Sequence, residues 1–332
     1  MLYLLRKIMF PFSLVYALVV HFRNFLYDTG VFTSKSYKTP TICVGNLSVG
    51  GTGKTPMTEF LIRLLQDKRV AILSRGYRRK SKGFVLATPQ SSVLDLGDEP
   101  YQMFRKFPKV SIAVDGDRQE GIEQLETLVG PDVILLDDAF QHRRVKPSFS
   151  ILLTAFNELY RDDWYLPTGN LRDSKKEARR AEVIIVTKCP KDLPRSEQER
   201  IREKLKPLPN QKVLFAWLAY AETFSDGAGG ILEYDGLSDK KVALVTGIAS
   251  PEPLVSHLKS QGIVFEHLKF GDHHHFTASE IQQFGSYDII VTTEKDFVRL
   301  HGKVDGVYYL EIAHQFNADD KEMLQEAIAN LL

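Results

Sequence analysis

The fold of this chain is decided by one stretch, residues 42–56, which reads ICVGNLSVGGTGKTP. It begins with an apolar run typical of a buried strand, continues into a glycine-rich turn and enters a helical pattern at Thr55. Glycines let the backbone wrap with its N–H groups pointing inward, and the N-terminus of the following helix adds the positive end of a dipole. The stretch therefore predicts a phosphate-binding loop (P-loop) between a strand and a helix.

The residues of this loop predict how ATP and Mg²⁺ would be bound. The Lys54 ammonium would reach the β- and γ-phosphates, and the Thr55 hydroxyl would ligate Mg²⁺. The expected nucleotide-binding residues are Ser48, Gly50, Gly51, Thr52, Gly53, Lys54 and Thr55. The usual pattern has glycine at position 48, where this chain has serine, and the adjacent Gly50 and Gly51 supply backbone freedom nearby.

A second motif, VILLDD at residues 133–138, supports the first. It reads as an apolar strand that ends in two aspartates, Asp137 and Asp138. Carboxylates at the C-terminal end of a strand beside a P-loop are where Mg²⁺ and its waters are held. We therefore expect Thr55, Asp137 and Asp138 to form the metal site, without a prediction of which aspartate contacts the ion directly.

Around these motifs, short apolar runs alternate with amphipathic segments. The expected strands are Ile42–Val44, Val70–Leu73, Val110–Ala113, Val133–Leu136, Ile151–Leu153 and Val183–Val186, and the clearest helices are Thr55–Gln66 and Arg118–Leu128. This alternation predicts an α/β fold, a P-loop NTPase-type, mainly parallel sheet flanked by helices.

Two prolines within residues 206–210 mark an expected boundary. Beyond it the runs Val242–Val245, Ile263–His267, Ile289–Thr292 and Val307–Leu310 predict further strands. We expect an N-terminal interfacial helix at 1–30, a P-loop domain at 31–206 and a smaller α/β domain at 211–332 that closes over the nucleotide.

The composition excludes several classes of protein. The formal net charge of the 332 residues is only +1, which gives no reason to expect a nucleic-acid partner. Cys43 and Cys189 have no metal-ligand spacing, so a disulfide scaffold and a structural zinc site are not expected, and a reducing compartment fits.

The N-terminal apolar run, Ile8–Val20, is shorter than the roughly 20 residues that a membrane-spanning helix needs. No small-residue cleavage site follows it, which argues against a signal peptide. Residues 1–38 contain five cations and one aspartate, a local balance of +4. A core helix and a membrane-surface helix both remain open, and the flanking cations suit the lipid interface.

Three classes of P-loop protein compete. A regulatory GTPase would need glycine where this chain has Phe140, and VTKCP at residues 186–190 lacks both ends of the N-K-x-D motif. A partitioning-type ATPase, acting as a membrane-associated switch or scaffold, shares the loop but carries a lysine where this chain has Val49. The third class, a small-molecule or lipid kinase, needs a base and cations for an anionic substrate.

The motifs together identify a family. The chain resembles the tetraacyldisaccharide 4′-kinases, which phosphorylate the lipid A precursor of Gram-negative bacteria. The matching segments are residues 44–56, LSRGY at 73–77, GDEP at 97–100, DDAFQHR at 137–143, LPTGNLRD at 166–173 and TTEKD at 292–296. Two departures from the family pattern, Ala139 for glycine and Asp173 for glutamate, are small.

The resemblance implies a substrate and a set of roles. The substrate would be a tetraacyl glucosamine disaccharide 1-phosphate, phosphorylated on its 4′-hydroxyl. Asp98 would be the base, working with His273, and Lys54 would complete the catalytic set. Since guanidinium groups match phosphate bidentately, we expect the substrate to be bound by Arg75, Arg118 and Arg172, with Asn170 bonding the sugar.

The resemblance also implies where the protein works. The N-terminal helix would contact the membrane, so a peripheral protein at the cytoplasmic face of the inner membrane is expected. The expected partners are the lipid A precursor and the membrane surface, and the expected state is a monomer. The acyl-chain pattern is left open.

Overall fold

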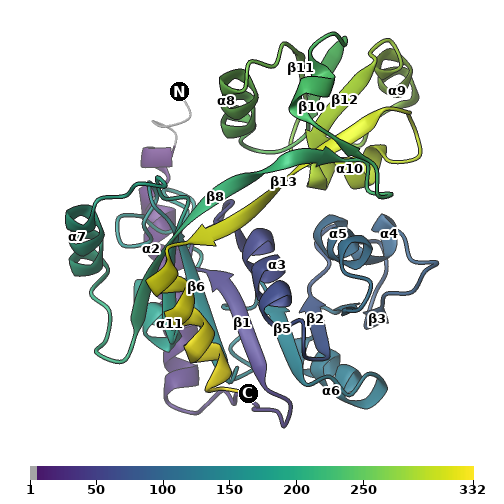
Figure 1. Ribbon diagram of the computed structural model, residues 1–332. Helices are drawn as coiled ribbons and strands as arrows, with labels where there is room; N and C mark the ends of the chain where they lie inside the picture. The colour runs from purple at the N-terminus through teal and green to yellow at the C-terminus, as the bar shows by residue number, and fades with distance from the viewer. Residues whose placement is uncertain (1–5) are drawn as a thin grey trace.

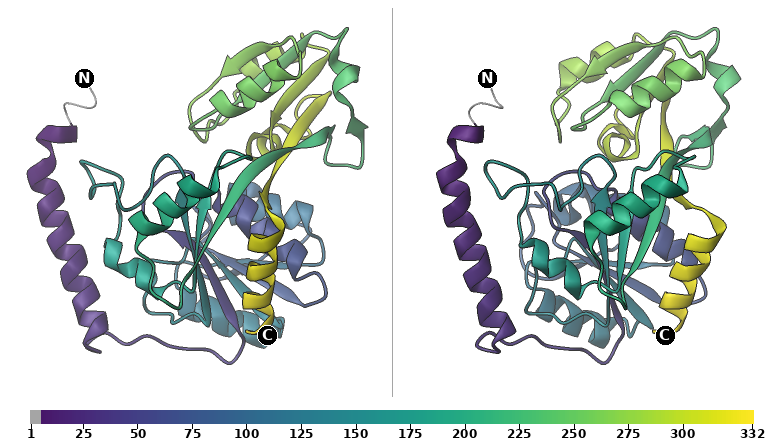
Figure 2. Two further views of the ribbon diagram at one scale, coloured as in Figure 1. Left: turned by 60° about the vertical axis from the view of Figure 1, so that its left-hand side comes forward. Right: turned by 90° about the vertical axis from the view of Figure 1, so that its left-hand side faces the viewer.

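The computed structural model describes residues 6–332 and is organised around one continuous sheet (Figure 1). Thirteen strands join in the order β11-β10-β12-β13-β8-β7-β6-β1-β5-β2-β4-β3, with β9 paired to β8. The sheet has a larger half, which contains β1, and a smaller half, which contains β10. Figure 2 shows the smaller half standing above the larger one, with the chain crossing between them on two long strands.

The larger half is mainly parallel because helices cover both faces of its sheet. Its strands are β1 Thr41–Asn46, β2 Val70–Ser74, β3 Val85–Leu86, β4 Ser111–Val114, β5 Val133–Asp137, β6 Phe149–Ala155 and β7 Val183–Thr187. All pair in parallel except β3, which lies antiparallel to β4 at the edge. β1, β2, β5, β6 and β7 are buried along their whole length, which explains their continuous apolar runs.

The helices of this half follow their strands in the usual βα order. They are α3 Lys54–Leu64, α4 Val93–Leu96, α5 Asp98–Lys106, α6 Arg118–Leu128, α7 Arg195–Leu205 and, from the C-terminus, α11 Ala318–Ala329. The apolar side chains of α3 and α11 meet on one face of the sheet, where Met57, Leu61, Leu324 and Ile328 share one core.

The smaller half has its own core. Its strands are β9 Ile231–Leu232, β10 Val242–Thr246, β11 Glu266–Lys269 and β12 Ile289–Thr293, and its helices are α8 Glu252–Ser260, α9 Ala278–Phe284 and α10 Glu294–Leu300. β10, β11 and β12 are parallel, and two apolar clusters cover the two faces of the sheet.

Two long strands connect the halves. β8 Lys212–Ser225 runs parallel to β7 at its start and then pairs antiparallel with β13 Val307–Phe316, which itself lies parallel to β12. β8 is absent from the strands expected from the sequence, because a long apolar run does not distinguish strand from helix.

The expected α/β class, a large and mostly parallel sheet flanked by helices, is confirmed. One strand was placed wrongly: β11 begins at Glu266 rather than Ile263, because the chain is still in a turn at Gly262, where φ is 76°. The division into domains stays a prediction. Helix α11, residues 318–329, packs on the larger half, where it shares a core with α3.

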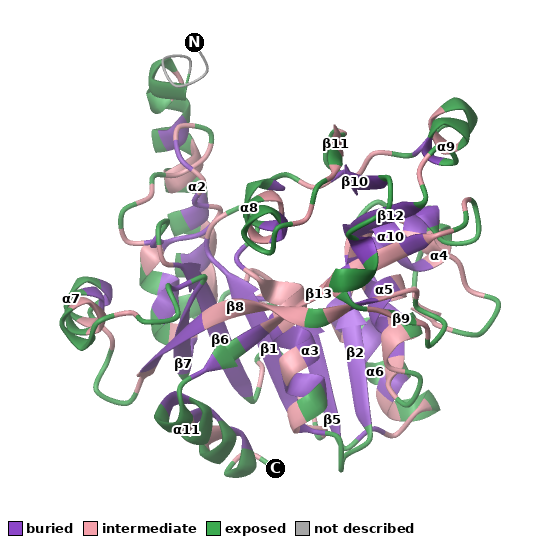
Figure 3. Ribbon diagram, turned by 45° about the horizontal axis from the view of Figure 1, so that its top comes forward, coloured by how far each residue is buried: buried purple, intermediate pink, exposed green. Residues whose placement is uncertain are grey.

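The N-terminal helix α2, Phe10–Asp28, lies along one side of the larger half (Figure 2). Its outer side is largely exposed, as Figure 3 shows. The large apolar side chains exposed from this region are Ile8, Phe10, Phe12, Leu14, Val15, Leu18, Val19, Phe22 and Phe25. Among residues 6–332 no helix is both long enough and apolar enough to cross a membrane.

Candidate active site

The glycine-rich loop joins β1 to α3, as the sequence predicts. Gly50 and Gly53 have φ angles of 117° and 82°, in the left-handed region that side chains disfavour. Gly51 is exposed and Thr52 is buried, with its N–H donating to the Gly50 carbonyl at 3.1 Å. Thr55 is half-buried in the first turn of α3. The glycines thus fall where the backbone needs them.

The start of the loop is fastened to a distant segment. The Val49 N–H donates to the Asn170 carbonyl at 2.8 Å. The Ser48 hydroxyl donates to Asp163 Oδ2 at 3.1 Å, and the same carboxylate accepts the Asn170 N–H at 3.0 Å. The Asn170 side chain accepts a hydrogen bond from Arg6 at 2.8 Å. Two residues expected to bind nucleotide and sugar, Ser48 and Asn170, therefore lie side by side.

Lys54 and Arg172 share the same polar partners. Lys54 Nζ lies 3.4 Å from Asn46 Oδ1 and 3.7 Å from Asp138 Oδ1. Arg172 donates to both Asp138 oxygens and to Asn46 Oδ1. Burial raises the pKa of Asp138, but the hydrogen bonds from Arg172 and the charge of Lys54 outweigh it, so the net pKa is lowered. The structure thus brings together two cations suited to phosphate around one ionised carboxylate.

The pKa of Asp137 is shifted in the opposite direction to that of Asp138. It is buried at the end of β5 and accepts a hydrogen bond from the Ser74 hydroxyl at 3.0 Å. Burial, followed by the negative charges of Asp138 and Glu99, raises the pKa of Asp137 to about 6. A divalent cation would relieve this excess of negative charge.

The available donors suit Mg²⁺. They are hydroxyl and carboxylate oxygens, from Thr55, Asp137 and Asp138, and hard cations prefer oxygen ligands. Within residues 6–332 no cluster of three or more His, Cys, Asp or Glu side chains forms a complete metal site. Mg²⁺ commonly uses one or two carboxylates and takes its remaining ligands from phosphates and water.

The expected substrate arginines differ in environment. Arg75 is exposed just after β2, whereas Arg118 is buried at the start of α6. Arg118 donates to the backbone carbonyls of Asp115 and, at 3.5 Å, Asp137. Burial, followed by the charges of Arg118 and Arg75, lowers the pKa of His142 to about 4, so this ring is neutral in a cationic setting.

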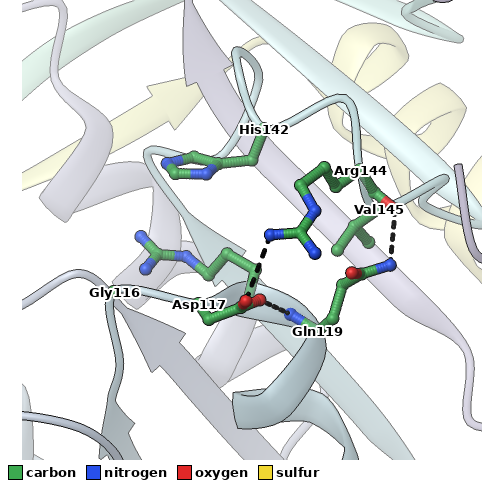
Figure 4. Close-up of a pocket in the computed structure, with 7 residues that line it drawn as sticks. Gly116, Asp117, Gln119, His142, Arg144 and Val145 are labelled. Atoms are coloured by element: carbon green, nitrogen blue, oxygen red, sulfur yellow. Dashed lines mark hydrogen bonds and ion pairs between the residues drawn. The ribbon is translucent and has the colours of Figure 1, made fainter. Parts of the chain in front are cut away.

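A cavity of about 220 Å³ opens beside these cations (Figure 4). It is lined by Gly116, Asp117, Arg118, Gln119, His142, Arg144 and Val145. Arg144 donates to Asp117 Oδ2 at 3.2 Å across it. His142 belongs to the DDAFQHR motif, but no role was predicted for its side chain. Its position beside Arg118 suits an anionic or sugar group.

The two residues expected to form the base lie in contact. Asp98 is the first residue of α5, and His273 lies in a loop after β11 with a φ of 60°. His273 Nδ1 lies 2.8 Å from Asp98 Oδ2, although 175 positions separate the two residues. The backbone N–H of His273 donates to the Gly247 carbonyl at 3.0 Å, which holds the loop against the end of β10.

Two cations that the sequence analysis did not assign enclose this pair. Arg299 Nε donates to Asp98 Oδ1 at 3.0 Å, and its Nη2 donates to Oδ2. Lys295 Nζ lies 3.0 Å from His273 Nε2. Arg299 Nη2 also lies 2.9 Å from His273 Nδ1, so each ring nitrogen has a cation within 3.0 Å and Nδ1 also faces the Asp98 carboxylate. Lys295 and Arg299 are four residues apart on α10, a spacing that places them on one helix face.

The electrostatics of Asp98 follow from these contacts. Burial raises the pKa of Asp98. The hydrogen bonds from Arg299 and then from His273 lower it by more, so the net pKa lies below its ordinary value. Asp98 is therefore ionised at neutral pH. Its three hydrogen bonds occupy three of about four lone-pair positions on a carboxylate, which leaves one on Oδ1 for a hydroxyl group.

Glu99 interacts with both acidic parts of the site, the Asp98–His273 pair and the Asp137–Asp138 pair. Its Oε1 lies 3.3 Å from Lys295 Nζ, and its charge is one of those that raise the pKa of Asp137. The TTEKD motif thus supplies Lys295, which contacts His273. Its Thr293 caps α10 by accepting the Asp296 N–H at 3.2 Å.

The two halves of the molecule also share a buried ion cluster behind the site. Lys106 on α5 contacts Glu59 at 2.7 Å, Glu294 at 2.6 Å and Glu311 at 3.0 Å. Burial and the charge of Glu59 raise the pKa of Glu294, and the three carboxylates raise the pKa of Lys106 against its burial. This cluster joins α3 and α5 to α10 and β13.

Comparisons with known proteins agree on one family. The family model described as "Tetraacyldisaccharide-1-P 4'-kinase" matches residues 5–332. A tetraacyldisaccharide 4′-kinase of Flavobacterium psychrophilum is 47% identical, over 98% of this chain and 96% of its own. A protein of the same description from Flavobacterium johnsoniae is 50% identical, over 94% and 93% of the two chains.

A solved structure is similar over the whole chain. It is described as the "apo" form of LpxK from Aquifex aeolicus in complex with ATP. It superposes with a TM-score of 0.82 at 33% sequence identity, covering 98% of this chain and 99% of that one.

Proposed function

The chain belongs to the tetraacyldisaccharide-1-phosphate 4′-kinase family, and from this premise we propose how its residues carry out the reaction. It is an ATP-dependent kinase that transfers the γ-phosphate to the 4′-hydroxyl of a tetraacyl disaccharide 1-phosphate in lipid A biosynthesis. The observation that carries this conclusion is the family match across residues 5–332.

We propose that ATP lies on the P-loop, with Lys54 and the loop amides on its phosphates. The transition state of phosphoryl transfer is loose and its charge lies on the γ-oxygens, so the protein mainly positions and neutralises. Lys54 would exchange its contacts with Asn46 and Asp138 for the phosphates. Ser48, Gly50, Gly51, Thr52, Gly53 and Thr55 complete the proposed nucleotide site.

The proposed cation is Mg²⁺, held by Thr55 and by Asp137 and Asp138. When bound, it would neutralise charge on the nucleotide phosphates. The fit rests on the oxygen-only donor set and on the environment of Asp137, whose pKa is raised by burial first and then by the negative charges of Asp138 and Glu99. Since Arg172 already bonds both oxygens of Asp138, we propose that Asp137 is the aspartate that faces the cation.

We propose that Asp98 accepts or orients the proton of the sugar hydroxyl, with His273 holding its second oxygen. Arg299 and Lys295 then act as positioning residues: Arg299 keeps Asp98 ionised, and both cations hold the His273 ring in place. The free lone pair on Asp98 Oδ1 is the proposed contact for the 4′-hydroxyl.

The anionic end of the substrate requires cations of its own. We propose that Arg75 and Arg172 contact the substrate, with Arg118 forming the wall of the cavity beside His142. Arg118 already donates to two backbone carbonyls, so we assign it electrostatic attraction more than direct contact. Asn170 would bond the sugar once its contact with Arg6 is released.

The function is tested by incubating the full chain with labelled ATP, Mg²⁺ and a tetraacyl disaccharide 1-phosphate in detergent micelles. We expect a doubly phosphorylated lipid and negligible ADP release when the lipid is omitted. Robust lipid-independent hydrolysis with no labelled lipid would instead indicate a partitioning-type ATPase.

We further propose that α2 rests on the membrane surface and that the protein is a peripheral monomer at the cytoplasmic face of the inner membrane. The apolar side chains of α2 point mostly to solvent, which argues against a core helix. Its inner side is tied down by polar contacts instead: Ser13 Oγ donates to Thr168 Oγ1 at 2.7 Å, and Asn24 Nδ2 donates to Asp173 Oδ1 at 2.8 Å.

The membrane proposal predicts the behaviour of a triple variant, Phe12→Ser, Val15→Ser and Val19→Ser. All three side chains are more than 60% exposed, so their replacement should leave the fold intact. Each apolar side chain contributes of order 1 kcal/mol when buried in lipid, so liposome binding should fall about 100-fold. Flotation with anionic liposomes measures the loss, and circular dichroism checks folding.

The matched control is Ile231→Ser with Val264→Ser, two apolar residues of the smaller half that are more exposed than the three tested residues. It should bind liposomes as the wild type does. If the folded triple variant floated like the wild type, the membrane contact would lie elsewhere, for example at residues 75–82.

A further inference from the structure

Two carbonyls of the P-loop are held from outside the loop by side chains of other strands. The Thr187 hydroxyl, at the end of β7, donates to the Thr52 carbonyl at 2.8 Å. His314 Nε2, on β13, donates to the Gly53 carbonyl at 2.9 Å. Both side chains are fully buried, so these bonds do not compete with solvent.

These two bonds fix amide groups that face the other way. In a planar trans peptide the C=O and the following N–H point in opposite directions. A hydrogen bond to the Thr52 carbonyl therefore sets the direction of the Gly53 N–H, and one to the Gly53 carbonyl sets that of the Lys54 N–H. Amides at the N-terminus of a P-loop helix are the groups that cradle phosphate oxygens.

We propose that Thr187 and His314 are positioning residues that hold the Gly53 and Lys54 amides in the orientation required to bind the phosphates of ATP. The inference rests on the nucleotide site assigned above. Both side chains bond to backbone carbonyls of the P-loop, so each residue would act through the loop backbone.

Packing alone gives little reason for a histidine at position 314. Its Nδ1 has no hydrogen-bond partner although the ring is buried, which is costly for a polar atom. Burial also lowers the pKa of His314 to about 4, so the ring is neutral and contributes no charge. An apolar side chain would fill the space without an unpaired nitrogen. What it could not supply is the donor to Gly53.

The His314 ring lies close to the backbone of Gly53. A Cβ added at Gly53 would lie 2.7 Å from His314 Nε2, so the ring and the loop backbone are in direct contact. Gly53 is the N-cap of α3 with a φ of 82°, and its carbonyl also accepts the Met57 N–H at 3.1 Å, the first hydrogen bond of the helix. His314 is a second donor to the same carbonyl, from outside the helix.

His314 also connects the P-loop to the region of the base. β13 pairs with β12, and α10, which follows β12, carries Lys295 and Arg299. The same β13 strand ends beside the P-loop with His314. One strand thus extends from the neighbourhood of the Asp98–His273 pair to the phosphate-binding amides.

The test uses two variants that remove a donor at nearly constant volume, Thr187→Val and His314→Leu, and two that retain one, Thr187→Ser and His314→Gln. Calorimetry on the full chain measures the binding of Mg·ATP and of adenosine. We expect each donor-removing variant to bind ATP about tenfold more weakly and adenosine unchanged, since one oriented hydrogen bond is at stake. The donor-retaining variants should recover most of the affinity.

Kinetics separate positioning from general damage. The KM for ATP should rise in Thr187→Val and His314→Leu, while the KM for the lipid stays the same. The melting temperature of His314→Leu should equal or exceed that of the wild type, because the unpaired Nδ1 is gone.

The proposal is rejected if folded donor-removing variants bind ATP within twofold of the wild type, or lose adenosine binding to the same degree. It is also rejected if neither variant folds, since both contacts would then be structural. A wild type that binds ATP but does not phosphorylate lipid would count against the kinase assignment and leave these measurements interpretable.

Discussion

Replacing Lys54 with alanine is expected to lower phosphoryl transfer by on the order of 10³-fold or more, as the loss of a charge-stabilising group typically does. Within residues 6–332 the contacts of the Lys54 ammonium are to Asn46, at 3.4 Å, and to Asp138, at 3.7 Å. Because Arg172 remains bonded to Asp138, the substitution leaves no unpaired buried carboxylate and the fold should persist.

The measurement is lipid phosphorylation in detergent micelles at saturating ATP, with circular dichroism to check folding. Lys68→Ala is the matched control, because Lys68 lies just beyond α3 and its ammonium pairs with the neighbouring Asp67, at 3.4 Å. It should retain wild-type turnover. Wild-type turnover in a folded Lys54→Ala variant would refute the assignment of the P-loop.

Replacing Asp98 with alanine is expected to lower kcat by about 10² to 10⁴-fold, the range of general acid–base groups, with little change in ATP affinity. The hydroxyl would lose its acceptor, and His273 would lose the carboxylate that orients it. Asp98 carries a lowered pKa, so it is already ionised in the neutral range and no titration of this group should limit the wild-type rate there.

The alanine variant also removes one of the two anions that pair with the Arg299 guanidinium in the described part of the chain and leaves the other, Asp296, at 3.6 Å. Asp98→Asn keeps the volume of the side chain and separates loss of charge from loss of packing. Both variants should bind ATP like the wild type and turn over slowly.

His275→Ala is the control for this set, since His275 is exposed beside His273, and His274→Ala should matter less than His273→Ala. If Asp98→Ala abolished ATP binding while chemistry at saturation survived, Asp98 would be a nucleotide-site residue rather than the base.

The sequence by itself determined the parts of this protein that are local. The P-loop is contiguous, and its strand, glycines, Lys54 and Thr55 stand in a register that requires one backbone path. The buried strands β1, β2, β5, β6 and β7 were predictable because a parallel strand covered on both faces must be apolar along its length. The family resemblance then supplied the pairing of Asp98 with His273, which spacing alone does not encode.

The structure adds contacts between residues that are far apart in the sequence. Arg299 and Asp98 are 201 positions apart, and His314 and Gly53 are 261 apart. Such a hydrogen bond leaves no periodicity in the sequence, because it depends on where β8 and β13 carry the smaller half relative to the larger one. The exposure of the apolar side of α2 was likewise decided by tertiary packing: the same apolar run suits a core or a surface, and the contacts of its polar side distinguish the two. Local patterns fixed which elements form, whereas the long-range pairing of polar side chains, which lowers the pKa of Asp98 and orients the P-loop carbonyls, is a property of the assembled fold.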